Sequence, residues 1–229
     1  MKTEDPTMTM PTETEPDTVT GNAPSHSAHC LRFVRHGITE PNRAALRCGG
    51  DLDVPLTQTG RAQAALAAHH IAAMSPPVGV LVTSNLQRTK ETAQIIASIL
   101  GGLPVVVQPL FAERHLGEWN LLPVASTQAW IDERLTPPGG EADTVFLARI
   151  EAAVHTLQPL WAQRPLLVSS QGVARALGEM AGLAQGLKLD NAAVAEFDLA
   201  PWTAASAMAA ASPPASAVAV LPAPVECSA

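Results

Sequence analysis

The chain has 229 residues, of which 47% are hydrophobic, and a formal net charge of −7. This is enough apolar material for one folded domain, and the basic stripe that marks a nucleic-acid-binding surface is missing. No apolar run approaches the roughly 20 residues that a membrane helix needs, and the start lacks the basic and apolar regions of a signal peptide. The composition therefore argues against nucleic-acid and membrane partners and predicts a cytoplasmic protein.

The two ends of the chain differ from its middle. Residues 1–28 are rich in Thr, Pro, Glu and Asp, and residues 201–229 are mostly Ala, Pro, Ser and Val. Such segments bury too little apolar surface to offset the entropy lost on ordering, so we expect two disordered tails around a domain at residues 29–200. The widely spaced Cys30, Cys48 and Cys227 predict free thiols in a reducing compartment and no metal site.

The first half of the domain alternates short apolar runs with helical patterns. Residues 30–34 (CLRFV) read as a buried strand, and an Ala-rich helix follows at 57–74, with Thr57 as its N-cap. A second strand is expected at 78–84. A helix with one apolar face follows at 85–100 and ends at Gly101-Gly102.

The second half repeats this alternation around one long irregular segment. Residues 104–108 predict a third strand, and residues 109–140 a long functional loop with some helix. Further elements are a helix at 143–161, a strand at 164–170, a helix at 172–183 and a last strand at 192–200. The pattern predicts an α/β fold: a three-layer sandwich with a mostly parallel central sheet flanked by helices.

Polar side chains gather where three of these strands end. Arg35, His36 and Gly37 follow the first strand, Ser84, Asn85 and Arg88 follow the second, and Ser169, Ser170 and Gln171 follow the fourth. Ligands of such sheets bind at the carboxyl ends of the strands. Two guanidinium groups, an imidazole and several neutral donors suit a tetrahedral anion, because arginine binds phosphate oxygens bidentately. Taken singly, each residue has a simpler interpretation as a solvated surface group, Arg88 included.

Five motifs in a fixed order carry a family resemblance. They are RHGITEPN (35–42), GDLDVPLTQTGRAQA (50–64), TSNLQRTKETA (83–93), LFAERHLGEW (110–119) and PPGGEADTVFLAR (137–149). Together they resemble the histidine phosphatase superfamily, also called phosphoglycerate-mutase-like, from about Leu31 to Leu199. The order and spacing of the five motifs are specific, although RHG alone would be a weak signal.

The resemblance implies a role for each matching residue. His36 would be the nucleophile that becomes phosphohistidine, and Glu113 the proton donor. Arg35 and Arg88 would bind the phosphate, and Asn42 would be an accessory contact. The family's chemistry requires no cofactor and no metal. Gly37 would let the backbone turn so that Arg35 and His36 both face the pocket.

The sequence departs from the family pattern at the last motif. Where the family usually has Ser-His-Gly-Gly, this chain has VSSQGVARAL, so Ser170 stands at the second histidine and Gln171 at the following glycine. Serine offers one neutral hydrogen bond where a histidine adds charge, and the amide of Gln171 would partly replace it. We expect Ser170 and Gln171 to contact the phosphate in a pocket with reduced activity.

The resemblance predicts a phosphomonoesterase that hydrolyses a small phosphorylated metabolite. The alternative is a catalytically degenerate protein that binds a phosphate ester and acts as a sensor or regulator. A phosphomutase is a third reading, which the short segment between Trp119 and Pro137 disfavours because it leaves water access to the phosphohistidine. Leaving-group contacts are expected within 43–50 and 111–140, with Arg43, Arg47 and His115 as candidates. The oligomeric state stays open.

Overall fold

The computed structural model describes residues 29–183, 187–200, 202 and 203. The predicted tails, 1–28 and 201–229, lie outside these residues apart from Trp202 and Thr203. Cys30 and Cys48 are free thiols, and Cys227 lies outside the described part. No helix in that part of the chain is long and apolar enough to cross a bilayer.

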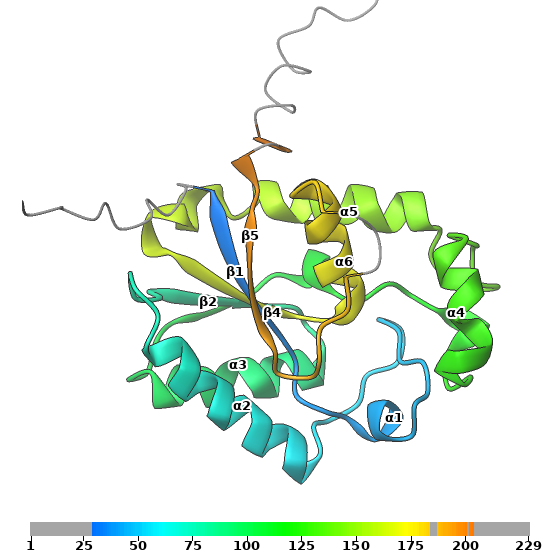
Figure 1. The fold of residues 1–229 in the computed structure, drawn as a ribbon, viewed down its shortest axis with the longest axis horizontal. Coiled ribbons are helices and arrows are strands. Elements are labelled where there is room, and N and C mark those ends of the chain that lie inside the picture. Colours follow the sequence, from blue (N-terminus) through cyan, green and yellow to red (C-terminus); the bar gives the residue numbers. More distant parts are fainter. Residues whose placement is uncertain (1–28, 184–186, 201, 204–229) are drawn as a thin grey trace, which may run out of the picture.

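A five-stranded sheet forms the middle layer, with the strand order β3-β2-β4-β1-β5 (Figure 1). β1, β2, β3 and β4 run parallel, and β5 pairs with β1 antiparallel. The mostly parallel three-layer sandwich predicted from the sequence is confirmed. The strands are β1 (Cys30–Arg35), β2 (Val80–Thr83), β3 (Val105–Val107), β4 (Pro165–Ser169) and β5 (Val194–Asp198).

Helices cover both faces of the sheet. In Figure 1, α2 (Gln58–Ala72) and α3 (Gln87–Ile99) lie below the sheet, and α5 (Asp143–His155) and α6 (Gln171–Met180) lie above it. Alternate strand residues point to opposite faces. Thus Phe33 packs in the cluster with α5 and α6, whereas its neighbour Val34 packs in the cluster with α2 and α3. Burial on both faces explains why these strands read as continuous apolar runs.

One predicted helix is shorter than expected. The segment 143–161 is helical only to His155, and a 3-10 helix, η3 (Gln158–Gln163), replaces the remainder. Pro159 is the cause, because a proline disfavours the α conformation of the preceding residue and lacks the N–H that a helix interior requires.

Two helices lie outside the sandwich layers, beyond the carboxyl ends of the parallel strands. α1 (Glu40–Arg43) follows β1 directly and is capped by Thr39. α4 (Val124–Asp132) lies in the long segment 109–140, which also holds two short 3-10 helices, η1 (Pro109–Phe111) and η2 (Gly117–Trp119). Figure 1 shows α1 and α4 on the same side of the molecule. They frame the strand ends at which the polar residues gather.

Candidate active site

Strands β1 and β4 bring His36 and Ser170 out of the sheet side by side. Arg35 is in register with Ser169, and the His36 N–H donates to the Ser169 carbonyl at 2.9 Å. His36 and Ser170 are the next residues of these two parallel strands, and both are buried. The sheet therefore unites two predicted site residues that are far apart in the sequence.

The imidazole of His36 is held in one orientation. Its Nδ1 lies 2.8 Å from the Gly37 carbonyl oxygen, which can only accept, so Nδ1 carries the proton and Nε2 keeps its lone pair. Burial lowers the pKa of His36 well below 6.5, and the nearby Arg88 and Arg35 lower it further. The ring is thus neutral at pH 7 and has a free nucleophilic nitrogen.

Arg88, at the start of α3, is fully buried, so its interpretation as a surface cation is wrong. Its Nη1 donates to the Leu52 carbonyl at 2.9 Å and its Nη2 to the Gly49 carbonyl at 3.1 Å. Arg35 donates from Nη1 to the Leu189 carbonyl at 2.5 Å. Burial lowers the pKa of Arg35, and Arg88 lowers it further, although Glu113 and Asp190 oppose the shift.

Four buried side-chain atoms have no hydrogen-bond partner in the part of the chain that is described, and three of them belong to predicted site residues. These three are Nε of Arg35, Nε of Arg88 and the hydroxyl of Ser170, and the fourth is the hydroxyl of Thr83 at the end of β2. Ser170 is the N-cap residue of α6, yet its side chain makes no capping bond. A buried donor without a partner costs about 1–3 kcal/mol, so three of them around one neutral imidazole indicate a site built for an acceptor-rich ligand.

Glu113 reaches the start of α6. Its Oε2 accepts from the Gly172 N–H at 2.8 Å, and its Oε1 accepts from the Arg114 N–H at 2.8 Å. A Cβ at position 172 would lie 2.1 Å from Oε1, so a larger residue there would displace this carboxylate. Arg35 also interacts with Glu113 electrostatically, which places the predicted proton donor beside the predicted phosphate contacts.

Gly37 is needed for a reason other than the predicted one. It does not adopt the left-handed backbone that glycine alone favours. Instead, a Cβ at position 37 would lie 2.2 Å from the Gly60 carbonyl oxygen. Gly37 therefore permits close packing of the loop that follows His36 against the first turn of α2.

The side-chain oxygen of Asn42 and both polar groups of Gln171 are bonded within the protein. The Oδ1 of Asn42 accepts from Thr39 and from Asn191 Nδ2, the latter at 3.2 Å. The amide of Gln171 donates to the Leu187 carbonyl at 2.6 Å and accepts from the Leu189 N–H at 2.9 Å. Their roles as phosphate contacts stay predictions.

The three leaving-group candidates lie in different surroundings. Arg43 forms an exposed ion pair with Glu40 on α1. The ring of His115 lies against Gly50, because a Cβ at Gly50 would be 2.8 Å from its Cδ2. Arg47 is half-buried and donates to Thr127 on α4 at 2.8 Å, and it interacts electrostatically with Glu113. Of the three, Arg47 links the site to α4.

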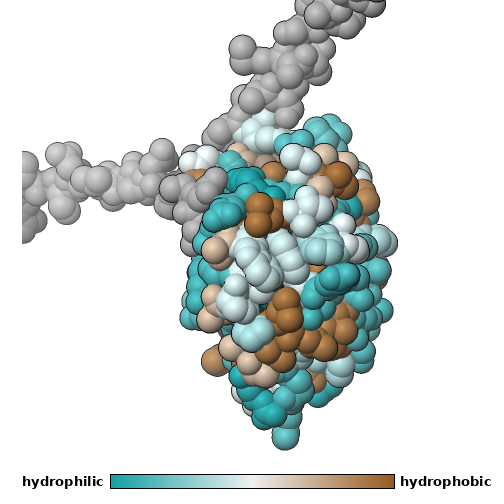
Figure 2. Space-filling model, turned by 90° about the vertical axis from the view of Figure 1, so that its right-hand side faces the viewer, coloured by the Kyte–Doolittle hydropathy of each residue, from teal (hydrophilic) through white to brown (hydrophobic). Residues whose placement is uncertain are grey.

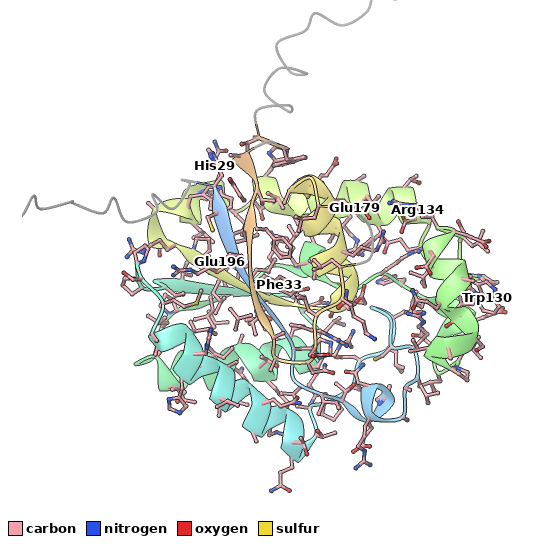
Figure 3. All side chains as sticks on the ribbon, viewed as in Figure 1. His29, Phe33, Trp130, Arg134, Glu179 and Glu196 are labelled. Atoms are coloured by element: carbon pink, nitrogen blue, oxygen red, sulfur yellow. The ribbon has the colours of Figure 1, made fainter. Side chains whose placement is uncertain are left out.

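The face that includes α4 is mixed in polarity. Figure 2 shows an apolar patch there among hydrophilic side chains. Trp130 projects outward from α4 in Figure 3, and its ring lies 5.1 Å from the ring of the buried Trp119.

A second group of charged residues, only partly buried, adjoins Glu113 through its neighbour Arg114. Asp143, at the start of α5, accepts from Arg114, Arg134 and Arg175 at 3.3, 2.9 and 2.7 Å. Glu179 on α6 binds Arg134 and Arg175, both at 3.0 Å, and Figure 3 shows Arg134 and Glu179 pointing toward each other. We call these residues the Asp143 network: Arg114, Arg134, Asp143, Arg175 and Glu179.

Sequence reasoning missed the residues that hold the site together. Arg149 donates to the carbonyls of Leu110, Ala112 and Glu113 at 2.8, 2.9 and 3.4 Å, and so fixes the loop that carries Glu113. Asn191 donates to the His36 carbonyl at 3.0 Å. Arg149 closes the last of the five motifs, which was its only sequence signal. Asn191 had none.

Fold and site define an α/β protein in which two arginines and a neutral imidazole gather at the carboxyl ends of parallel strands. A sequence profile of the histidine phosphatase superfamily (branch 1) matches residues 31–207. The chain belongs to this superfamily.

Individual relatives agree with this assignment. A protein of Photorhabdus laumondii named "Probable phosphoglycerate mutase GpmB" is 35% identical, over 75% of this chain and 86% of its own. Glucosyl-3-phosphoglycerate phosphatase of Mycolicibacterium vanbaalenii is 32% identical, over 70% of this chain and 76% of its own.

Solved structures are similar in fold. A mycobacterial glucosyl-3-phosphoglycerate phosphatase, solved as a complex with VO3, has a TM-score of 0.62 and 27% identity, covering 73% of this chain and 90% of its own. The alpha-ribazole phosphatase from Shigella flexneri has a TM-score of 0.63 and 25% identity, covering 73% of this chain and 89% of its own.

Proposed function

We propose that this protein is a phosphomonoesterase that hydrolyses a small phosphorylated metabolite through a phosphohistidine at His36. The observation that carries the proposal is the set of buried, unpartnered donors around a neutral imidazole: Arg35 Nε, Arg88 Nε and Ser170 Oγ. A phosphoryl group supplies acceptor oxygens for all three donors and a phosphorus atom for Nε2 to attack.

In the first half-reaction, the lone pair of His36 Nε2 forms a bond to phosphorus while the ester P–O bond breaks. The leaving alkoxide takes a proton from Glu113. Positive charge from Arg35 and Arg88 stabilises the equatorial oxygens, whose negative charge the pocket must bind most strongly in the transition state. The donors are fixed beforehand by the carbonyls of Leu52, Gly49 and Leu189, so little reorganisation is needed.

In the second half-reaction, water attacks phosphorus and gives a proton to Glu113. The P–N bond breaks, its electron pair returns to Nε2, and inorganic phosphate leaves. Glu113 thus acts first as acid and then as base, ending in its starting state. These two half-reactions use protein side chains alone and require no cofactor or metal.

Hydrolysis is favoured over mutase chemistry, although the relatives include proteins named for each. The segment between Trp119 and Pro137 is short, with one helix, α4, of nine residues. A short cover leaves the phosphohistidine open to water. With a phosphoglycerate as substrate, this proposal expects release of inorganic phosphate rather than formation of an isomer.

Replacing the nucleophile tests the proposal most directly. We expect His36→Ala in the full chain to abolish phosphate release from p-nitrophenyl phosphate and from a panel of phosphorylated metabolites. A radiolabelled ester that the wild type turns over should leave acid-labile label on the wild type after a rapid quench and none on the variant. His69→Ala, on an exposed position of α2, is the matched control. Wild-type turnover by His36→Ala would refute the assignment.

A further inference from the structure

Gln171 is bonded entirely to the segment that joins α6 to β5. Its Nε2 donates to the Leu187 carbonyl at 2.6 Å, and its Oε1 accepts from the Leu189 N–H at 2.9 Å. Both polar groups of the side chain are therefore used on two backbone sites within three residues. Such a pair of bonds fixes the segment's position relative to the first turn of α6.

The same segment is bonded at its other end to the pocket. The Leu189 carbonyl accepts from Arg35 Nη1 at 2.5 Å, so Leu189 is bonded to Gln171 through its N–H and to Arg35 through its oxygen. Asn191 donates to the His36 carbonyl at 3.0 Å, and the Ala192 N–H lies 3.0 Å from the Arg35 carbonyl oxygen. We call residues 187–192 the strap.

Arg35 needs a restraint of this kind. It is partly buried, and burial is the main cause of its lowered pKa, to which the like charge of Arg88 also contributes. In the described residues neither guanidinium forms an ion pair that would hold it in place. Among the described residues, the Leu189 carbonyl is the one hydrogen-bond acceptor of the Arg35 side chain.

We propose that Gln171 is a positioning residue that acts through Leu189 to aim the Arg35 guanidinium at the phosphoryl group. This rests on the proposed function for the identity of the anion. It also gives position 171 a role other than direct phosphate contact. Gln171, which stands where the family has glycine, bonds to the strap. The strap in turn bonds to Arg35, which is proposed to bind phosphate.

The test measures phosphate binding rather than turnover. Inorganic phosphate is titrated into the full chain by calorimetry, in the wild type, Gln171→Met, Arg35→Lys and the double variant. Methionine keeps the length of glutamine without its hydrogen bonds. We expect Gln171→Met to weaken phosphate binding roughly three- to tenfold, the equivalent of one net hydrogen bond. In the Arg35→Lys background the same change should have little further effect, since residues that act in series are not additive.

Two further variants separate positioning from general stability. Gln108→Met is the matched control, because the Gln108 amide also bonds twice, to Thr156 and to the Leu110 N–H. It should lower the melting temperature without changing phosphate affinity. Gln171→Glu keeps the acceptor for the Leu189 N–H, loses the donor to Leu187 and adds a negative charge, so its phosphate affinity should fall at least as far as that of Gln171→Met.

The outcomes distinguish this proposal from the proposed function. Equal losses from Gln171→Met in the wild-type and Arg35→Lys backgrounds would overturn the positioning role, even if His36→Ala is inactive. A coupled loss of phosphate affinity would support it, even if His36→Ala still hydrolyses ester and the nucleophile assignment fails. A wild type that binds no phosphate would overturn both.

Discussion

Two clusters of buried and partly buried arginines in this molecule differ in how their charge is balanced. In the Asp143 network, each guanidinium faces a carboxylate at 2.7–3.3 Å. In the pocket, Arg35 and Arg88 are bonded to carbonyl oxygens and keep an unpartnered Nε.

The direction of the arginine pKa shifts does not separate the two clusters. Burial lowers the pKa of Arg35 in one cluster and of Arg114 in the other, whereas the hydrogen bond to Glu179 raises the pKa of Arg134. A neutralised network stabilises the fold. Arg35 and Arg88, which form no ion pair among the described residues, are suited to bind an anion. Proximity to arginine therefore says little about function until the counter-charges are counted.

Replacing one arginine of each cluster by methionine tests whether the two clusters have different roles. We expect Arg88→Met to lower kcat by about 10²–10³-fold, the loss typical of a preorganised transition-state donor. Its stability should stay close to that of the wild type, because the variant also removes a buried cation without an ion pair. We expect Arg114→Met to lower the free energy of unfolding by about 3 kcal/mol, since it breaks a buried ion pair with Asp143.

Activity and urea denaturation of both variants are the measurements. Per folded molecule, Arg114→Met should keep activity within about tenfold of the wild type, because its effect on Glu113 is indirect. Equal destabilisation by the two substitutions would mean that the pocket arginines are structural after all.

Adding charge to the pocket should sharpen the contrast. The family resemblance places a histidine at position 170, and we expect Ser170→His to raise turnover of p-nitrophenyl phosphate by about one order of magnitude. A charge-assisted bond would then replace a neutral one. Gln171 is left unchanged, so the strap keeps its bonds. A lower rate in Ser170→His would mean that the site is adapted to serine. Tight phosphate-ester binding with negligible hydrolysis in the wild type would instead favour the regulatory alternative.

The smallest expected effect is on how the free energy of unfolding varies with pH. The pKa of His36 is lower in the folded protein than the 6.5 of an unfolded chain, so between the two values the unfolded state binds more protons. The free energy of unfolding should therefore fall as the pH drops below 6.5. His36→Gln should reduce this fall, measured by urea denaturation in phosphate-free buffer at pH 7.5 and pH 5. The exposed His69→Gln is the control and should keep the wild-type dependence.

The sequence predicted the strands of the sheet and the residues at their ends, because both follow from local rules. Apolar runs and helix caps fix the elements, and parallel strands place Arg35 and Ser169 in register. The sequence did not show what Gly37 packs against or what Gln171 binds. Gly60 and Leu189 are 23 and 18 residues away, and only the tertiary structure brings them into contact.

Residues 49–53 contact both Arg88 and the loop that carries Glu113. Gly49 and Leu52 hold Arg88, while the Gly50 N–H bonds to the Arg114 carbonyl and Asp51 accepts from Leu116 and Gly117. Residues 49–53 thereby form one frame that holds both Arg88 and the loop of Glu113. Residues 121–135 contact this frame through Arg47, which donates to Thr127, and through the Leu135 carbonyl, which accepts from Arg114. A change within residues 49–53 should therefore displace Arg88 and Glu113 together.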